Sequence, residues 1–224
     1  MAYPEPIPQI NSSHQRGIRL TVALVLVFIV IVVAGFVYTM VKPRALSDSA
    51  LRANNTFLFD AVRDIGDFAL IDDNNKPFTP ADLRGKWSLL FFGYTFCPDI
   101  CPTTMAQLNQ FYGKLRPEYA KDTQIIMVSV DPARDDVAKL HEYVHYFNPQ
   151  FRGVTGEFLA LQKFATSLNI PFSKIPDGGD NYQIEHSGSI AIINPAGHYV
   201  GFFKAPQELD KLLTNYQSIR ITRD

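Results

Sequence analysis

One uninterrupted apolar segment near the amino terminus divides this chain of 224 residues into two parts. No charged residue occurs in residues 20–41, and residues 20–34 are almost wholly aliphatic. A helix of about 20 apolar residues, rising about 1.5 Å per residue, crosses a hydrocarbon layer about 30 Å thick. The apolar region of a cleaved secretory signal is shorter, about 7–15 residues, and no Ala-x-Ala cleavage site follows this one. We therefore predict an uncleaved transmembrane helix over residues 20–41.

The apolar segment also sets the organisation of the rest of the chain. We predict a cytoplasmic tail over residues 1–19, a linker over 42–56 and one compact domain over 57–224. Basic residues lie on both sides of the segment, namely Arg16, Arg19, Lys42, Arg44 and Arg52. Because the two flanks are nearly balanced in positive charge, the positive-inside rule does not fix the topology. The formal net charge of -1 does not indicate a basic surface of the kind that binds nucleic acid.

The carboxyl-terminal part alternates between strand and helix patterns, which predicts an α/β fold with a central mixed sheet. The predicted strands are 68–71, 87–94, 123–130, 189–193 and 198–203, and the predicted helices are 102–116, 135–147, 157–168 and 207–213. Helical connections imply parallel crossovers, whereas the turn at 194–197 joins the last two strands as an antiparallel hairpin. This order of elements is that of a thioredoxin-like fold.

The only two cysteines, Cys97 and Cys101, lie between the strand at 87–94 and the helix at 102–116. A disulfide between them would close a short loop and constrain little, so the spacing favours redox chemistry or metal binding. Each cysteine precedes a proline, which disfavours helical backbone, so we predict both outside regular helix with Cys101 as the N-cap. The nearby helix terminus should lower the pKa of the thiols and favour thiolate.

A metal at this pair needs further ligands, and histidine is the obvious source. Two thiolates cannot complete a four-coordinate structural zinc site, whereas two thiolates and one imidazole suit Cu(I) and can also hold Cu(II). His14 precedes the apolar segment, and His198 is predicted on a strand facing solvent. His186 ends a loop before the strand at 189–193, on the rim where sites of such sheets form. From spacing alone, His186 is either a ligand or a surface loop histidine.

A second histidine pattern offers a competing interpretation. His141, Glu142 and His145 match H-E-x-x-H, the signature of zinc proteases, on the helix predicted at 135–147. No third ligand follows at the spacing of the metzincins, and Pro149 ends the helix soon afterwards. We therefore favour a solvated helix face, with Val144 turned inward.

Three motifs stand out in the sequence: Gly-Tyr-Thr-Phe-Cys-Pro-Asp-Ile-Cys-Pro at 93–102, Val-Ser-Val-Asp-Pro-Ala-Arg-Asp at 128–135 and Glu-His-Ser at 185–187. Together they resemble the SCO/SenC family. Members of that family are membrane-tethered, thioredoxin-like copper proteins that help to assemble the CuA centre of cytochrome c oxidase. The resemblance covers residues 67–213, and it implies that Cys97, Cys101 and His186 are copper ligands.

Three acidic residues lie near these motifs. Where the family usually has aspartate before the histidine, this chain has Glu185, so a supporting role for that side chain is open. Asp99 and Asp131 are candidates to line the site, although an exposed loop acid is the favoured interpretation for each.

The resemblance implies a copper metallochaperone that delivers one copper to the CuA site of oxidase subunit II. The alternative is an enzyme, a thiol–disulfide reductase that uses Cys97 and Cys101 as a redox-active pair to keep the oxidase cysteines reduced. Thioredoxins typically have two residues between the cysteines and a proline facing them, whereas this chain has three and offers His186 there. Both differences favour metal binding. A peroxiredoxin-like peroxidase would rest on the shared fold alone.

Localisation and partners follow from the same resemblance. Family members face the periplasm or the mitochondrial intermembrane space. No long Arg/Ser-rich transit peptide precedes the apolar segment, which favours a single-pass protein of the bacterial inner membrane with its domain in the periplasm. The expected partners are oxidase subunit II, other periplasmic copper carriers and thiol–disulfide proteins.

Overall fold

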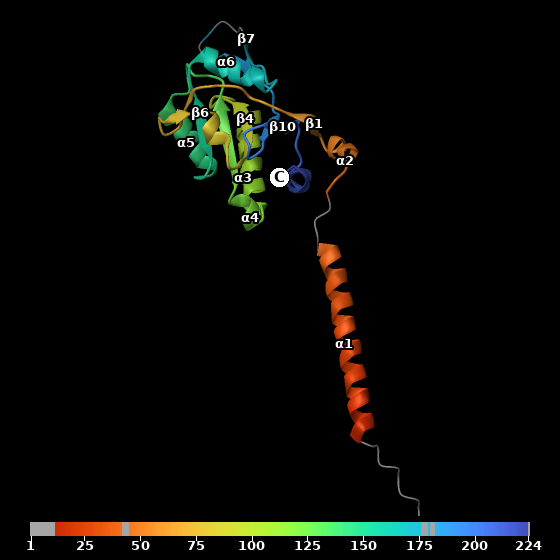
Figure 1. Cartoon of the computed structure of the whole chain (residues 1–224). Helices are drawn as coiled ribbons and strands as arrows, with labels where there is room; N and C mark the ends of the chain where they lie inside the picture. Colours follow the sequence, from red (N-terminus) through yellow and green to blue (C-terminus); the bar gives the residue numbers. More distant parts are fainter. Residues whose placement is uncertain (1–11, 42–44, 176–178, 180–181, 224) are drawn as a thin grey trace, which may run out of the picture. The chain divides into compact units, whose positions relative to one another are not determined.

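The structure is a computed structural model that describes residues 12–41, 45–175, 179 and 182–223. It divides into two units, Met1–Arg44 and Ala45–Asp224, each of which is described by itself. The first unit contains helix α1 (Ser12–Val41), drawn in red and orange in Figure 1. Its segment Arg16–Met40, 25 residues, is long and apolar enough to cross a membrane. The apolar helix of a signal sequence meets the same criterion. The first 11 residues of the predicted tail lie outside the described part.

The second unit is built on an eight-stranded sheet with the order β1-β10-β9-β4-β5-β6-β2-β3. Strands β4, β5 and β6 run parallel, and the other neighbours are antiparallel. The strands of this sheet are β1 (Thr56–Arg63), β2 (Leu70–Asp72), β3 (Pro77–Phe78), β4 (Trp87–Gly93), β5 (Thr123–Ser129), β6 (Arg152–Thr155), β9 (Ile190–Ile193) and β10 (Tyr199–Phe203). The predicted mixed α/β sheet with parallel crossovers and a final hairpin is confirmed.

Helices cover both faces of this sheet, which explains why β4, β5 and β9 are buried along their whole length. The helices of this unit are α2 (Asp48–Ala53), α3 (Ile100–Lys114), α4 (Pro117–Ala120), α5 (Val137–Phe147), α6 (Phe158–Ser167) and α7 (Leu209–Thr222), with a short 3-10 helix at Pro80–Leu83. Helix α3 packs between α5 and α7 (Figure 1). Successive side chains of a strand point to opposite faces. Accordingly, the ring of Phe92 contacts Phe164 of α6, whereas that of Phe91 faces the side of α3.

Sequence analysis predicted no strand at β1, β3 or β6, and two helices also differ from the sequence-based expectation. Residues 45–56, predicted as part of a linker, contain helix α2, which is capped by Ser47 and buries Leu51. Helix α7 continues to Thr222, well beyond the predicted end at residue 213, because Tyr216 and Ile219 extend its buried face. The sequence pattern was too short at α2 and too polar at the end of α7 to reveal these two helices.

Candidate metal centre

Cys97 and Cys101 lie where β4 gives way to α3, on either side of the helix start. Asp99 is the N-cap of α3, so Cys101 is the second residue of the helix and Pro102 the third. The prediction that Cys101 caps the helix and lies outside it is therefore wrong. The first four N–H groups of a helix have no partner within it, so a proline there removes no hydrogen bond and the helix can begin before it.

The structure brings Cys97, Cys101 and His186 together, although His186 follows Cys101 by 85 residues. Their sulfur and nitrogen ligand atoms all lie within 4.8 Å of one another, and Cys101 Sγ is 3.5 Å from His186 Nε2. With metal–ligand bonds of about 2.0–2.3 Å, two ligands of one ion lie roughly 3.3–3.8 Å apart. Both cysteines are buried as free thiols, and His186 is half-buried. The group can therefore hold one metal ion.

A glycine at the end of β4 makes room for the sulfur of Cys101. A Cβ atom on Gly93 would lie 2.7 Å from Cys101 Sγ and 2.9 Å from an edge carbon of the Phe91 ring. Gly188 plays the same part beyond His186, because its Cβ would lie 2.9 Å from Cδ1 of Ile100. The two glycines let the strand end, the helix start and the histidine loop approach closely.

The two thiols differ in their acidity. The hydrogen bond from the Cys101 thiol is the main cause that lowers the pKa of Cys97, to about 4. Burial opposes that shift, whereas His186 and the backbone N–H groups of Asp99 and Cys101 add to it. The same hydrogen bond and burial raise the pKa of Cys101. Without metal, Cys97 is thus the thiolate and Cys101 the thiol that donates to it.

This asymmetry predicts how the reduced, metal-free protein reacts with iodoacetamide. Because the folded pKa of Cys97 is depressed to about 4, its thiolate persists as the pH falls from 8 to 5 and is lost only near that value. An ordinary cysteine, with a pKa of about 8.5, is almost wholly protonated at pH 6. We expect labelling at pH 6 on Cys97, little on Cys101, and little on either in denaturant, as read by mass spectrometry. Equal labelling of both cysteines with a midpoint near pH 8.5 would contradict the assignment.

Tyr94, one residue beyond β4, positions the segment that leads to His186. Its hydroxyl donates to Gln183 Oε1 at 2.7 Å and accepts from the N–H of Ile184 at 3.3 Å. Gln183 and Ile184 belong to strand β8 (Gln183–Glu185), which pairs with β7 (Ser173–Ile175) in a separate hairpin. The Tyr94 ring meets the imidazole of His186 edge-on, with centroids 5.6 Å apart. This contact fixes the histidine relative to the strand that precedes Cys97.

A buried acid fixes the other side of the cysteine loop. Asp135 accepts from the backbone N–H of Thr95 at 2.9 Å, from the Thr95 hydroxyl at 2.5 Å and from the Ser129 hydroxyl at 2.7 Å. Sequence analysis did not single out Asp135, although it closes the motif at 128–135. Its partner Thr95 is 40 residues away, so no local pattern could reveal the contact.

Asp131 is also buried, with 2 % of its surface exposed, so the expectation of an exposed loop acid is wrong for this residue. It accepts from the Tyr182 hydroxyl at 2.6 Å and pairs with Arg134, whose guanidinium also donates to the carbonyl of Tyr182. Asp131 thereby anchors the chain just before β8. Asp99 and Glu185 are exposed, and Asp99 reaches Cys97 through its backbone N–H.

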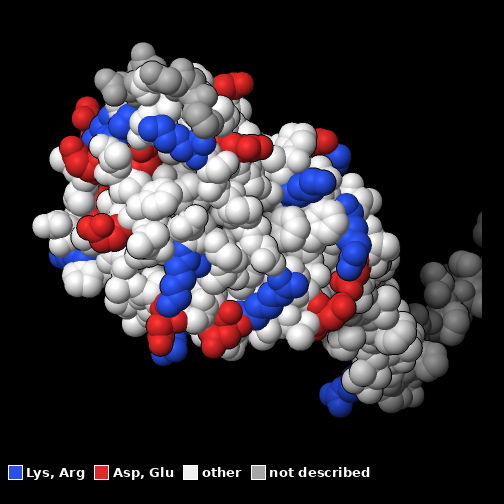
Figure 2. Space-filling view, turned by 90° about the horizontal axis from the view of Figure 1, so that it is seen from above, with Lys and Arg blue, Asp and Glu red and all other residues white. Residues whose placement is uncertain are grey.

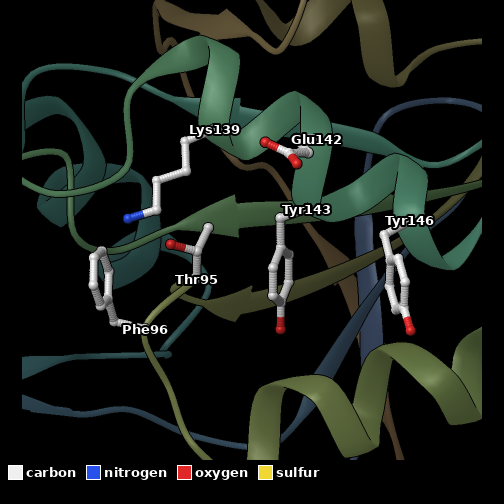
Figure 3. A pocket seen from close by; sticks show the side chains of 6 residues that line it. All are labelled: Thr95, Phe96, Lys139, Glu142, Tyr143 and Tyr146. Atoms are coloured by element: carbon white, nitrogen blue, oxygen red, sulfur yellow. The ribbon is translucent and has the colours of Figure 1, made fainter.

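A pocket of about 350 Å³ opens beside the cysteine loop, between that loop and α5 (Figure 3). The Nζ of Lys139 lies 3.2 Å from the centre of the Phe96 ring, which closes one end of the pocket. The lining residues are Thr95, Phe96, Lys139, Glu142, Tyr143 and Tyr146. The pocket gives the loop an open, partly apolar flank.

His198 is not a member of the Cys97, Cys101 and His186 group. His198 is half-buried in the turn before β10, which begins one residue later than predicted. His14 belongs to α1, and its side chain lies outside the described part.

Comparison with known proteins shows the family to which the chain belongs. The family model described as SCO1/SenC matches residues 60–219. The chain is 38% identical over 168 residues to a protein of Stutzerimonas stutzeri named "Putative copper-binding protein", which covers 75% of this chain and 80% of that protein. It is 35% identical to the Arabidopsis thaliana "Protein SCO1 homolog 1, mitochondrial" over 66% of this chain, and spans only 44% of that longer protein.

Solved structures extend the comparison to the fold. The crystal structure of Arabidopsis thaliana ScoI with copper bound matches with a TM-score of 0.65 and 34% identity, over 70% of this chain and 98% of that one. The thioredoxin-like fold predicted from the order of strands and helices is thereby confirmed.

Proposed function

Because this chain belongs to the SCO1/SenC family, we propose that it is a copper metallochaperone that delivers one copper ion to the CuA site of cytochrome c oxidase subunit II. The observation that carries the proposal is the convergence of Cys97, Cys101 and His186, with ligand atoms within 4.8 Å. The choice of metal is supported by two similar proteins: one is named a copper-binding protein, and the other was solved with copper bound.

The donor set fits copper better than the common alternatives. Thiolates are soft ligands that select Cu(I), zinc or iron–sulfur clusters, and imidazole suits copper and zinc. Three ligands satisfy Cu(I), can hold Cu(II), and leave a four-coordinate structural zinc site incomplete. Metal binding requires Cys101 to lose its proton, so copper loading replaces the proton shared by the two sulfurs.

Transfer needs one side of the ion to be reachable by the ligands of the acceptor. Cys101 is fully buried, whereas Cys97 retains 9 % exposure and His186 is half-buried, so an incoming ligand arrives over Cys97 and His186. Phe96, just before Cys97, and Ile100, just before Cys101, are 48 % and 39 % exposed and offer apolar contact surface. Figure 2 shows acidic and basic side chains mixed around an uncharged area on one face of the molecule. Such a surface suits a transient partner complex.

Helix α1 supports membrane attachment of the chaperone. An anchor of 25 suitable residues would keep the domain at the surface where a membrane-bound oxidase presents subunit II. We place the domain in the periplasm of a bacterial inner membrane, where other copper carriers and thiol–disulfide proteins are candidate donors.

A second function is supported by the unequal thiols. The thiolate of Cys97 could attack a disulfide of subunit II, forming a mixed disulfide and releasing one thiolate of the substrate. Cys101 would then attack Cys97, giving a Cys97–Cys101 disulfide and a fully reduced substrate. Two electrons pass from this protein to the substrate in that sequence.

The test is an anaerobic titration of the reduced full-length protein in detergent with Cu(I), followed by mixing with the copper-free CuA domain of subunit II. We expect one bound copper, its recovery with the separated CuA domain when copper content is measured after mixing, and much weaker binding by His186→Ala. His198→Ala is the matched control and should bind as the parent does. No copper above background would refute the chaperone. Reduction of a subunit II disulfide without copper transfer would favour the reductase.

A further inference from the structure

The two histidines of α5 are not simply solvated, contrary to the sequence-based expectation. Their spacing of four places them on one face of the helix, and this face meets the turn after β2. His141 Nδ1 lies 3.4 Å and His145 Nε2 lies 3.5 Å from Oδ2 of Asp73. His145 Nδ1 is 2.9 Å from His141 Nε2. The three residues thus form a cluster whose ligand atoms lie within 4.8 Å of one another.

Asp73 is buried with one carboxylate oxygen unsatisfied. None of its side chain is exposed, and its Oδ1 accepts from the side-chain amide of Asn74 at 3.3 Å. Oδ2 accepts no hydrogen bond from any residue in the described part of the chain. An ionised carboxylate is costly to bury without a partner, and such a group calls for an explanation. The oxygen faces the two imidazoles, so a positive charge between them would satisfy it.

The fold holds this carboxylate close to α5. The N–H of Asp73 donates to the carbonyl of Gly153 on β6 at 2.9 Å. A Cβ on Gly153 would lie 2.6 Å from Cγ of Leu140 and 3.1 Å from Cβ of Asp73. The absence of a side chain at Gly153 therefore lets α5, β6 and the Asp73 turn meet. The cluster is built from three elements and does not depend on an exposed loop.

Counting protons shows that neutral imidazoles cannot satisfy the cluster. Only one hydrogen fits between the rings at 2.9 Å. If His145 donates it, His141 can donate from Nδ1 to the Asp73 carbonyl at 3.2 Å, and the lone pair of His145 Nε2 then faces Oδ2. If His141 donates it instead, the lone pair of His141 Nδ1 faces the backbone carbonyl oxygen and Oδ2 of Asp73. In either case a lone pair opposes an oxygen, and a cation between them removes the conflict.

We propose that Asp73 and His145 bind a divalent transition-metal ion such as Zn²⁺, with His141 orienting His145. Imidazole and carboxylate together suit such ions. The separation of 3.5 Å between His145 Nε2 and Asp73 Oδ2 matches two ligands of one ion with bonds of about 2.0–2.2 Å. Metal-bound histidines usually donate their other N–H to an acceptor, and His141 Nε2 is that acceptor here. The side chains of His141 and His145 are 45 % and 25 % exposed, so water can complete the coordination.

This site is separate from the copper centre in chemistry and in residues. It contains no sulfur, and its ligands come from the β2–β3 turn and α5, not from the loop at 97–101. Neither histidine lines the pocket that Glu142 borders (Figure 3). The proposed metal site is therefore not the catalytic zinc site of a protease that the H-E-x-x-H pattern suggests.

The test is isothermal titration of Zn²⁺ into the full-length Cys97→Ser/Cys101→Ser protein in detergent, which removes the two thiolates. We expect one zinc ion per chain and a rise in melting temperature on zinc addition. Asp73→Asn, which keeps the size of the side chain, and His145→Ala should abolish both effects. His141→Ala should weaken binding by about 10–100-fold, as loss of an orienting partner does.

His198→Ala is the matched control, because it removes a histidine outside both clusters, and zinc binding should be unchanged. Circular dichroism verifies that each variant is folded. If the folded parent binds no zinc, the proposal fails. Binding that survives both Asp73→Asn and His145→Ala would overturn it as well.

Discussion

Replacing Cys97 and Cys101 by serine is expected to abolish copper binding, from one ion per chain to background. Serine keeps nearly the same shape, but its neutral hydroxyl is a hard ligand that does not select Cu(I). Removal of both sulfurs leaves only His186, and one imidazole cannot hold the ion in competition with a chelator. Because Cys101 is fully buried and Cys97 nearly so, the serine hydroxyls need partners, and the variant should unfold at a somewhat lower temperature.

The measurement is copper content after equilibration with a Cu(I) chelator of known affinity. Met105→Leu provides the control, because Met105 is a buried sulfur-containing residue of the same helix, one turn beyond Cys101. Leucine has a similar volume, so this variant should remain folded and bind one copper. Copper retained by the double serine variant would show that the ion lies elsewhere.

Gly93→Ala should damage the same centre without removing a ligand. The new methyl group would lie 2.7 Å from Cys101 Sγ and 2.9 Å from the Phe91 ring, distances that real contacts essentially never show. Because β4 and α3 are both packed in the core, the sulfur or the ring must move, and overpacking of this kind costs about 1–3 kcal/mol. We expect that loss in the free energy of unfolding, together with a copper affinity about 10–100-fold lower, comparable to the loss of a supporting contact.

Gly113→Ala is the matched control for this substitution. Gly113 lies on α3, and a Cβ there would meet nothing within 4 Å. Alanine in an exposed helix position is more favourable than glycine by up to about 1 kcal/mol. Chemical denaturation should therefore show Gly113→Ala as neutral or stabilising, with copper binding unchanged. Equal effects of the two substitutions would contradict the close approach at Gly93.

Much of the fold was predictable because its central elements carry strong local patterns. The apolar run at 87–94 forms β4, and α3 has its buried Met105, Leu108 and Phe111 at the expected spacings. The hairpin of β9 and β10 followed from an Asn-Pro-Ala-Gly turn between two apolar strands. Such elements follow from side-chain periodicity, which local sequence contains in full.

The parts that escaped prediction depend on contacts between distant residues. Cys101 lies inside α3 because the proline rule weakens in the first turn, where N–H groups have no partners. Asp131 is buried because Tyr182, 51 residues later, donates to it. His141 meets Asp73 across 68 residues, so no periodicity on α5 could reveal a carboxylate facing it. The cysteine spacing by itself predicts a site, whereas His186 is assigned as a ligand only through the family resemblance.

X-ray absorption at the copper edge of the Cu(I)-loaded full-length protein tests the three-ligand centre most directly. The account predicts two sulfur scatterers and one nitrogen scatterer, with the nitrogen contribution lost in His186→Ala and kept in His198→Ala. A spectrum with sulfur ligands alone in the parent protein, unchanged by His186→Ala, would contradict the assignment of His186 and with it the proposed copper centre.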